Sequence, residues 1–270
     1  MDKKIGLIGV GNMGGAIIEG LIQSNTLQGN QIYAYDLHLN DLRDRAKDLG
    51  FHLVSGNLEI LEKTDIIFLA IKPQVIQDVL EEIKDYAKPH HIFITMSPGV
   101  SIEYTQSFFR FNTKIIRIMP NTPALIGEGM TAFTCSSSVN GEEKRLVQGL
   151  LNSFGLVEEI EEKLLDAVTA ISGSSPAYVD IFIESLADGG VLLGLPRDKA
   201  YKFAAQAVVG AAKMVLKTGK HPAELKDWVC SPAGTTIVAV HQLEKHGFRN
   251  AIIEAMIAVD KKSKEMSKNR

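Results

Sequence analysis

The chain has 270 residues, of which 45% are hydrophobic and 23% are charged. These values are typical of a globular protein and exclude a disordered, collagen-like or coiled-coil chain, and the length predicts one large domain or roughly two. A formal net charge of −3, without a basic stretch that has aromatic residues interleaved, argues against a nucleic-acid partner.

The cysteines and histidines show no pattern typical of a metal site or a disulfide framework. Cys135 and Cys230 lie far apart and outside any CxxC motif, so we expect free thiols, no metal and a reducing compartment. The longest apolar stretch, residues 177–195, contains three acidic residues, too many for a membrane-spanning helix. We therefore expect a cytoplasmic protein that does not bind membranes.

From residue 4 to about 160, short β-branched runs alternate with segments of helical periodicity, which predicts a parallel sheet covered on both faces. Strands are predicted over residues 5–8, 31–35, 66–70, 92–96, 115–118 and 130–134. Helices are predicted over residues 13–23, 39–49, 75–86 and 142–154. We predict that residues 1–161 form an α/β dinucleotide-binding domain of the Rossmann type.

After residue 161 the strand-like runs stop, and residues 162–270 are predicted to form an all-α domain. Helices are expected over 164–171, 176–193, 196–217, 222–229, 235–246 and 248–264, with prolines near the starts and glycines after the ends. The segment 176–193 is apolar nearly all round, as in a helix that is buried on every side. About 110 residues of helix can hardly enclose it, so we expect the helical domain to form a homodimer.

The segment Gly9-Val10-Gly11-Asn12-Met13-Gly14 matches the GxGxxG fingerprint of dinucleotide-binding proteins. It follows a predicted strand and opens a predicted helix, the context that the motif needs. A glycine-rich turn without a ligand is the alternative. The predicted cofactor contacts here are Gly9, Gly11, Asn12, Met13 and Gly14.

Asp36 ends the second predicted strand, where an acidic residue would accept hydrogen bonds from the adenosine ribose. Its charge would disfavour a 2′-phosphate and so favour NADH over NADPH, although His38, Arg43 and Arg45 follow closely. The alternative is that Asp36 only caps the next helix.

Four further segments combine small and polar residues at the ends of predicted elements. Ala70-Ile71-Lys72-Pro73-Gln74 and the segment 119–124 follow strands, at the sheet edge where open α/β sheets bind ligands. The segments 172–178 and 231–236 open helices, whose free N–H groups suit a carboxylate or a phosphate. Ordinary capping by Ser and Thr is the alternative for both turns.

Taken together, these segments resemble the pyrroline-5-carboxylate reductases, which make proline by reducing a cyclic imine with NAD(P)H. The resemblance runs almost from end to end and includes the fingerprint, Asn57, AIKPQ at 70–74, MPNTPA at 119–124, the run 166–196, SPAGTT at 231–236 and Gly247-Phe248-Arg249. Four positions depart from the family pattern. Ser175 and Ala233 stand in place of Gly, Pro98 in place of Ala, and Asp36 in place of a small or amide residue.

The resemblance implies roles for individual residues. The N–H groups of Gly234, Thr235 and Thr236, with the Ser231 hydroxyl, would bind the substrate carboxylate, and the Thr236 hydroxyl would contact the ring nitrogen as the catalytic group. The residues implied at the cofactor are Asn57 at the adenine ribose, and Ala70, Lys72, Pro73 and Asn121 toward the nicotinamide. Lys72 as a solvated loop lysine is the alternative. Dimers assembled into larger rings are also implied by the resemblance.

Two other functions are considered. A β-hydroxyacid dehydrogenase shares the two-domain plan but needs a lysine on a helix of the second domain, and none occurs between Lys163 and Lys199. A protein that binds NADH without turnover would keep the fingerprint but would not need the 231–236 turn.

Overall fold

The computed structural model describes residues 3–268, apart from the side chains at 39, 41, 267 and 268. By its internal contacts the chain divides into two compact units. The sheet unit runs to Ser174 and includes the chain from Val259 onward, and the helical unit is Ser175–Ala258. Residues 162–174 thus pack with the sheet unit, where Leu165 lies in one buried cluster with Met119 and Ala132. The functional boundary between residues 161 and 162 stays a prediction.

The strands of the sheet unit form one sheet in the order β3-β2-β1-β4-β5-β6-β7-β8. The strands are β1 (Ile5–Ile8), β2 (Ile32–Tyr35), β3 (His52–Leu53), β4 (Ile66–Leu69), β5 (Ile92–Thr95), β6 (Lys114–Met119), β7 (Gly129–Cys135) and β8 (Gly155–Glu159). Neighbouring strands are parallel except β6 and β7, which are antiparallel. The expectation of a purely parallel sheet is wrong at this point, because the connection 120–128 is too short for a crossover.

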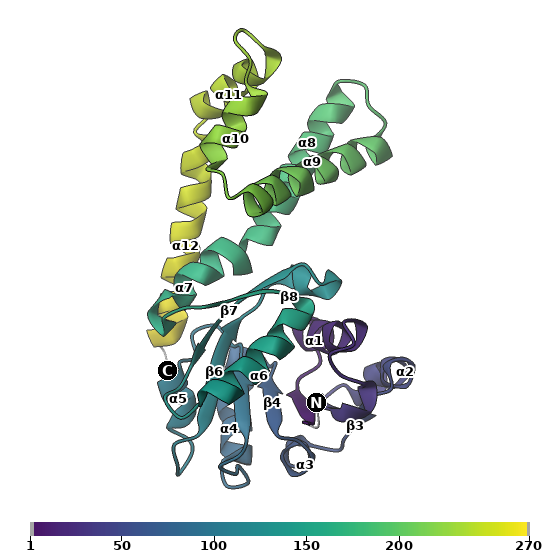
Figure 1. Ribbon diagram of the computed structural model, residues 1–270, viewed down its shortest axis with the longest axis vertical. Coiled ribbons are helices and arrows are strands. Elements are labelled where there is room, and N and C mark those ends of the chain that lie inside the picture. The colour runs from purple at the N-terminus through teal and green to yellow at the C-terminus, as the bar shows by residue number, and fades with distance from the viewer. Residues whose placement is uncertain (1–2, 269–270) are drawn as a thin grey trace. The chain divides into compact units, whose positions relative to one another are not determined.

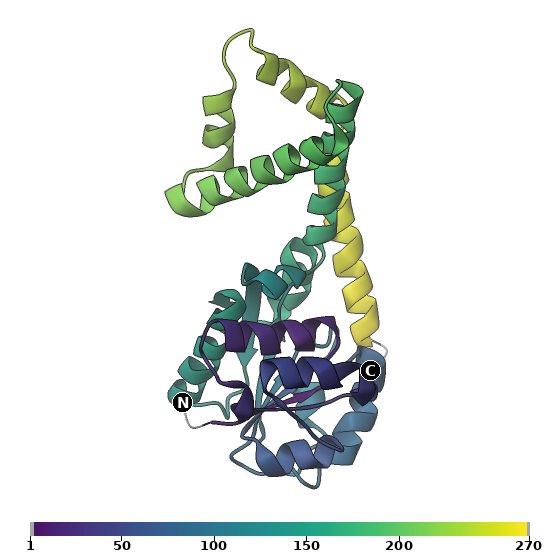
Figure 2. The same ribbon diagram turned by 90° about the vertical axis from the view of Figure 1, so that its right-hand side faces the viewer.

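Helices cover both faces of this sheet (Figures 1 and 2). The helices of the sheet unit are α1 (Asn12–Gln23), α2 (Leu39–Leu49), α3 (Asn57–Lys63), α4 (Ile76–Ile83), α5 (Ile102–Gln106), α6 (Gly141–Leu151) and α7 (Leu165–Val168). Side chains of α1, α2 and α6 share one buried cluster with one face of the strands, and those of α3 and α4 share another with the opposite face. The central strands β1, β4 and β5 are buried along their whole length, as expected for strands covered on both sides.

The elements β3, α3, α5 and β8 are absent from the sequence prediction. Each is short, and β8 is a half-exposed edge strand that ends in Glu158 and Glu159, so its hydrophobic pattern is weak. A strand this polar is recognised by its pairing with β7 rather than by its composition.

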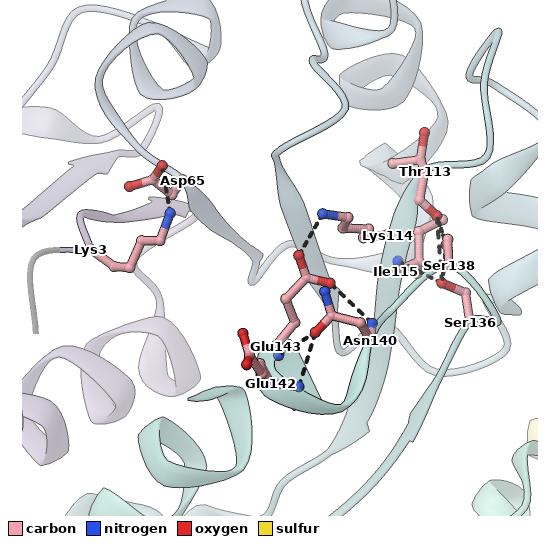
Figure 3. A network of polar contacts seen from close by, with 10 residues as sticks. All are labelled: Lys3, Asp65, Thr113, Lys114, Ile115, Ser136, Ser138, Asn140, Glu142 and Glu143. Carbon is pink, nitrogen blue, oxygen red and sulfur yellow. Dashed lines mark hydrogen bonds and ion pairs between the residues drawn. The ribbon is translucent and has the colours of Figure 1, made fainter. Parts of the chain in front are cut away.

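Polar side chains join β6, β7 and α6 (Figure 3). The Ser136 hydroxyl accepts a hydrogen bond from Ile115 N–H at 3.0 Å, at the end of the β6–β7 pair. Asn140 caps α6 by accepting from the N–H groups of Glu142 and Glu143 at 2.9 and 3.0 Å, while the Glu143 carboxylate accepts from Asn140 N–H. This reciprocal capping box fixes where α6 begins.

The helical unit is all-α, as predicted, and contains the helices α8 (Ser175–Leu192), α9 (Arg197–Thr218), α10 (Pro222–Val229), α11 (Thr235–Lys245) and the first part of α12 (Phe248–Lys268). The helix α8 packs on α9 through Ala187, Ala200 and Ala204. Much of its remaining apolar surface is exposed, including Ile181 at 63% and Leu192 at 87%. The expectation that α8 is buried on every side is therefore not met by this chain alone. Among the described residues, none lies in a helix long and apolar enough to span a membrane.

Candidate cofactor and substrate sites

The strand β1 leads into α1 through a turn that requires glycine at two positions. Gly9 has φ +93°, and a Cβ atom at this residue would lie 2.6 Å from the backbone oxygen of Ala70. A Cβ atom at Gly14 would lie 2.3 Å from the backbone oxygen of Gly9. These two glycines let α1 and β4 approach β1 closely, as the GxGxxG pattern predicts.

Gly11 differs from Gly9 and Gly14 because the space beside it, where a side chain would stand, is open. No atom lies within 4 Å of the place where a Cβ atom would stand. Gly11 is also the N-cap of α1, so the unpaired N–H groups of the first helical turn point toward this space. The turn therefore offers what a dinucleotide pyrophosphate needs, which is room beside the backbone and the positive end of a helix.

A cavity of about 530 Å³ lies over this turn, within the sheet unit. Its lining residues are Gly11, Asn12, Met13, Ala70, Ile71, Lys72, Pro73, Met96, Pro98, Met119, Pro120, Thr169, Gly173 and Ser174. Six of these were predicted as cofactor contacts: Gly11, Asn12, Met13, Ala70, Lys72 and Pro73. The cavity thus joins the fingerprint turn to the segments that follow β4, β5 and β6, at the carboxyl edge of the sheet.

Met119 and Pro120 belong to the segment 119–124, which was predicted to lie at the ligand-binding edge, although neither was named as a site residue. Met96 and Pro98 were not predicted; they follow the end of β5, so the rule that ligands bind at the carboxyl edge would have found them. Gly173 and Ser174 belong to the segment 172–178, which was singled out as a turn suited to a carboxylate or a phosphate and not as a wall of the cofactor cavity, and Thr169 was not singled out.

The Asp36 carboxylate is hydrogen-bonded to the fingerprint turn itself. Its carboxylate accepts hydrogen bonds from Val10 N–H at 2.8 Å and from His38 N–H at 3.0 Å. The N-cap of α2 is His38 and has no side-chain cap, so Asp36 does not cap this helix in the way the alternative supposed. A carboxylate has about four lone-pair positions, which leaves capacity for the ribose hydroxyls. Arg45 pairs with Glu19 on α1 at 2.9 Å.

Asn57 is 6% exposed and begins α3. Its side-chain amide donates to the Glu82 carboxylate at 2.7 Å, while its Oδ1 atom is buried without a partner among the described residues. An unpartnered buried acceptor is uncommon and suits a ligand donor such as a ribose hydroxyl. Lys72, by contrast, is exposed at the cavity, so its side chain is both solvated and within the lining.

The predicted substrate-binding residues lie in the helical unit, in the turn that precedes α11. The N-cap of α11 is Gly234, which makes no side-chain cap, so the capping alternative is wrong for this turn. Gly234 N–H bonds the Ser231 oxygen at 3.0 Å, and a Cβ atom at Gly234 would lie 2.2 Å from Ser231 Oγ. The turn therefore needs glycine here and leaves the N–H groups of Thr235 and Thr236 without acceptors in the helix.

The replacement at residue 233 falls on a strained position. Ala233 has φ +56°, in the left-handed region that favours glycine. This explains why the family pattern has glycine at this place. Nothing in the structure explains Ser175 in place of glycine.

Comparisons with known proteins bear on these sites. Residues 162–266 match the family model for pyrroline-5-carboxylate reductase dimerisation, and residues 4–99 match the model for NADP oxidoreductase, coenzyme F420-dependent. The chain is 46% identical to a pyrroline-5-carboxylate reductase of Escherichia coli (strain K12) over the full length of both chains. It is 39% identical to one of Arabidopsis thaliana, covering 98% of this chain and 96% of the relative.

A comparison with solved structures points to the same family. A pyrroline carboxylate reductase of Plasmodium falciparum, solved with NADP bound, is 35% identical and superposes with a TM-score of 0.90 over 98% of both chains. This chain belongs to the pyrroline-5-carboxylate reductase family. The predicted family, fold class and NAD(P)H-dependent oxidoreductase activity are thereby confirmed, and the match to a dimerisation model supports an oligomer. The comparisons favour neither the β-hydroxyacid dehydrogenase nor the non-catalytic alternative.

Proposed function

We propose that this enzyme reduces pyrroline-5-carboxylate to L-proline with NAD(P)H, the last step of proline biosynthesis. The observation that carries the proposal is the cavity over Gly11, where the fingerprint turn leaves open space beside a helix N-terminus. Full-length similarity to reductases of this name supports the choice of substrate. The test is oxidation of NADH or NADPH by the purified protein, which must depend on added imine. Binding of NADH without imine-dependent oxidation would favour the non-catalytic alternative.

For the cofactor, Gly9 to Gly14 would hold the pyrophosphate through backbone N–H groups. The remaining contacts are assigned to Asn57 at the adenine ribose, with its free Oδ1 atom as acceptor, and to Ala70, Lys72 and Pro73 toward the nicotinamide. Asn121, predicted as a further contact, is not among the lining residues of the cavity, because its amide bonds Met130 N–H and the Ser172 oxygen instead. The bound reduced nicotinamide supplies the hydride. Holding donor and acceptor in line accounts for most of the acceleration in this mechanism.

For the substrate, the turn before α11 would bind the carboxylate through the N–H groups of Thr235 and Thr236 and the Ser231 hydroxyl. The Gly234 N–H, predicted as a third donor, is bonded to the Ser231 backbone oxygen at 3.0 Å in this structure. The Thr236 hydroxyl would contact the ring nitrogen, as a hydrogen-bond partner or a proton relay. An imine nitrogen that is already protonated in solution needs no strong acid from the enzyme. This is consistent with a turn that carries hydroxyl groups and no histidine or lysine.

The role of Thr236 is tested by Thr236→Ala, which should lower kcat about tenfold or more while the NADH dissociation constant changes little. Thr236→Ser keeps a hydroxyl and should retain most of the activity. Thr218→Ala is a matched control, because Thr218 belongs to the same unit and its hydroxyl bonds the Met214 oxygen within α9. An unchanged kcat in Thr236→Ala would show that the assigned role is wrong.

We also propose that Asp36 shifts the cofactor preference toward NADH. A 2′-phosphate beside this carboxylate would add like-charge repulsion of about 1–3 kcal/mol, or about ten- to a hundredfold in relative binding. In Asp36→Asn the amide cannot accept from both Val10 N–H and His38 N–H, so both cofactors should lose some affinity. The informative quantity is therefore the ratio of kcat/KM for NADPH to that for NADH. This ratio should rise, and less so at high salt; an unchanged ratio would reject the ribose contact.

Finally, we propose a homodimer formed through the helical unit, with larger rings of dimers as the family resemblance implies, and a cytoplasmic location. The exposed apolar face of α8 and the free thiols of Cys135 and Cys230 support these assignments. A monomeric mass in light scattering at micromolar concentration would contradict the dimer.

A further inference from the structure

One wall of the cavity is a π-helical turn, Thr169–Gly173, between α7 and α8. The turn closes with the π-type hydrogen bond from Ser174 N–H to the Thr169 oxygen at 2.8 Å. Thr169, Gly173 and Ser174 all line the cavity. Single π-helical turns are rare and frequently occur at functional sites.

Asn121 forms a hydrogen bond to this turn without lining the cavity itself. It is 9% exposed and is not among the lining residues, whereas Met119 and Pro120 directly before it are. Its Oδ1 atom accepts from Met130 N–H at 2.8 Å, and its Nδ2 atom donates to the Ser172 oxygen at 3.1 Å. Asn121 therefore ties the π-helical turn to the end of the sheet.

The hydroxyl groups of Thr169 and Ser174 can accept hydrogen bonds, which most side chains of the cavity lining cannot do. The remaining walls are largely Met, Pro, Ala and Ile, and apart from Thr169 and Ser174 the lining residues with polar side chains are Asn12, which belongs to the fingerprint turn at the pyrophosphate end, and Lys72. A lysine ammonium only donates hydrogen bonds, so it cannot accept from an amide NH₂ group. The Thr169 hydroxyl donates to the Leu165 oxygen at 2.9 Å, and its lone pairs remain available as acceptors.

We propose that Thr169 and Ser174 accept hydrogen bonds from the carboxamide NH₂ of the nicotinamide, and that Asn121 is the positioning residue that places their turn. This inference rests on the proposed function, because it takes the cavity as the nicotinamide end of the cofactor site. The fingerprint turn defines the pyrophosphate end, and the π-helical turn contributes polar groups elsewhere in the same cavity. A fixed carboxamide would decide which face of the nicotinamide ring meets the substrate.

The test is calorimetric binding of NADH and of its reduced 3-acetylpyridine analogue, in which a methyl group replaces the NH₂ group. The wild type should bind NADH about five- to tenfold more tightly than the analogue, as expected for a hydrogen bond to a group left unpaired otherwise. In Thr169→Val with Ser174→Ala, and in Asn121→Asp, the two dissociation constants should come within about twofold. Asn121→Asp keeps the acceptor for Met130 N–H but places a carboxylate oxygen against the Ser172 oxygen.

Ser136→Ala is the control for Asn121→Asp, since it removes a buried hydrogen bond at the end of the β6–β7 pair without touching the cavity or the π-helical turn. It should lower the melting temperature and keep the wild-type binding ratio. If Asn121→Asp does not fold, the Thr169 and Ser174 variants still decide the proposal. A wild-type ratio in these variants would overturn it. Absence of imine-dependent oxidation in a wild type that discriminates the two dinucleotides would instead refute the proposed function alone.

Discussion

The two units of this chain bury their apolar residues to very different degrees. The sheet unit places large side chains such as Phe68, Phe93 and Phe133 fully inside, at 0 to 1% exposure. In the helical unit, the buried apolar residues that the structure describes are the alanines of the α8–α9 contact. Leu192 and Leu193 remain 87% exposed. One unit is complete as a single chain, and the other has a surface that needs a partner.

This difference separates two kinds of sequence segment that are both rich in apolar residues. In β4 and β5 a short apolar run is buried by helices of the same chain, whereas the apolar residues of α8, which also contains three acidic residues, stay largely open. A parallel sheet carries its own covering helices between its strands, but a helical hairpin has nothing comparable. The proposed dimer would complete the second core.

The largest effect should follow from a charge on the open face of α8. Ile181→Asp should weaken the dimer at least about a hundredfold, because an unpaired carboxylate would be buried in the interface. The measurement is the mass by light scattering across a concentration series. Tyr86→Asp, at a residue that is 52% exposed in the sheet unit, is the control and should remain dimeric. A dimeric Ile181→Asp would place the interface elsewhere.

Within the sheet unit, two substitutions of the fingerprint should separate folding from binding. Gly14→Ala should lower the free energy of unfolding by about 3 kcal/mol, since the new Cβ atom would overlap the Gly9 oxygen. Gly11→Ala should leave that free energy within about 0.5 kcal/mol, because its Cβ atom meets open space, while NADH binding weakens at least about tenfold. Denaturation and NADH titration of both variants check this. Equal losses of stability would mean that Gly11 also has a packing role.

Because His91 is buried in the sheet unit, the stability of this unit should decrease at acidic pH. Burial, and then the positive charges of His90 and Lys88, lower the pKa of His91 from 6.5 to about 4. Above about pH 6.5 neither the folded nor the unfolded state protonates this ring. As the pH falls from about 6.5 to about 4, the unfolded state gains a proton that the folded state excludes, so stability decreases by up to about 3 kcal/mol.

The variant His91→Asn tests this pH dependence. Its side-chain oxygen can replace the Nδ1 atom that accepts from Lys88 N–H at 3.1 Å. The difference in unfolding free energy between His91→Asn and the wild type should therefore change between pH 7 and pH 4. His90→Asn removes the exposed neighbour but leaves His91 buried, which is the larger cause of its lowered pKa, so this variant should keep most of the wild-type pH dependence. Parallel curves for all three proteins would refute the assignment.

The smallest effect is expected in the helical unit, at the strained turn before α11. Ala233→Gly should raise the free energy of unfolding by up to about 1 kcal/mol, because glycine adopts a positive φ without the steric penalty of Cβ. Thermal unfolding measures this. Ala211→Gly within α9 is the opposite control and should lower stability by about 1 kcal/mol. A destabilised Ala233→Gly would show that the flexibility of glycine outweighs the strain.

Much of the candidate site could be predicted from short-range patterns in the sequence. The spacing of Gly9, Gly11 and Gly14 identified the turn, because Gly14 must pass close to the Gly9 oxygen and Gly11 leaves room for a ligand, whereas the contact of Gly9 with Ala70 joins residues far apart in the sequence. Asn121 shows that such patterns do not reveal contacts with residues far away in the sequence. It was assigned to the cofactor with its neighbours, yet its amide faces away from the cavity lining and binds Ser172, which is distant in the sequence.

By itself, the sequence determined the alternation of strands and helices, the change to helices after residue 160, the fingerprint and the family. These features depend on periodicity and on steric rules that act over short distances. Only the tertiary structure decided that β7 runs antiparallel to β6, that Asp36 accepts from Val10 N–H, and that the π-helical turn 169–173 forms a wall of the cavity. Such contacts join residues far apart in the chain, and no local pattern records which distant group will satisfy a given polar atom.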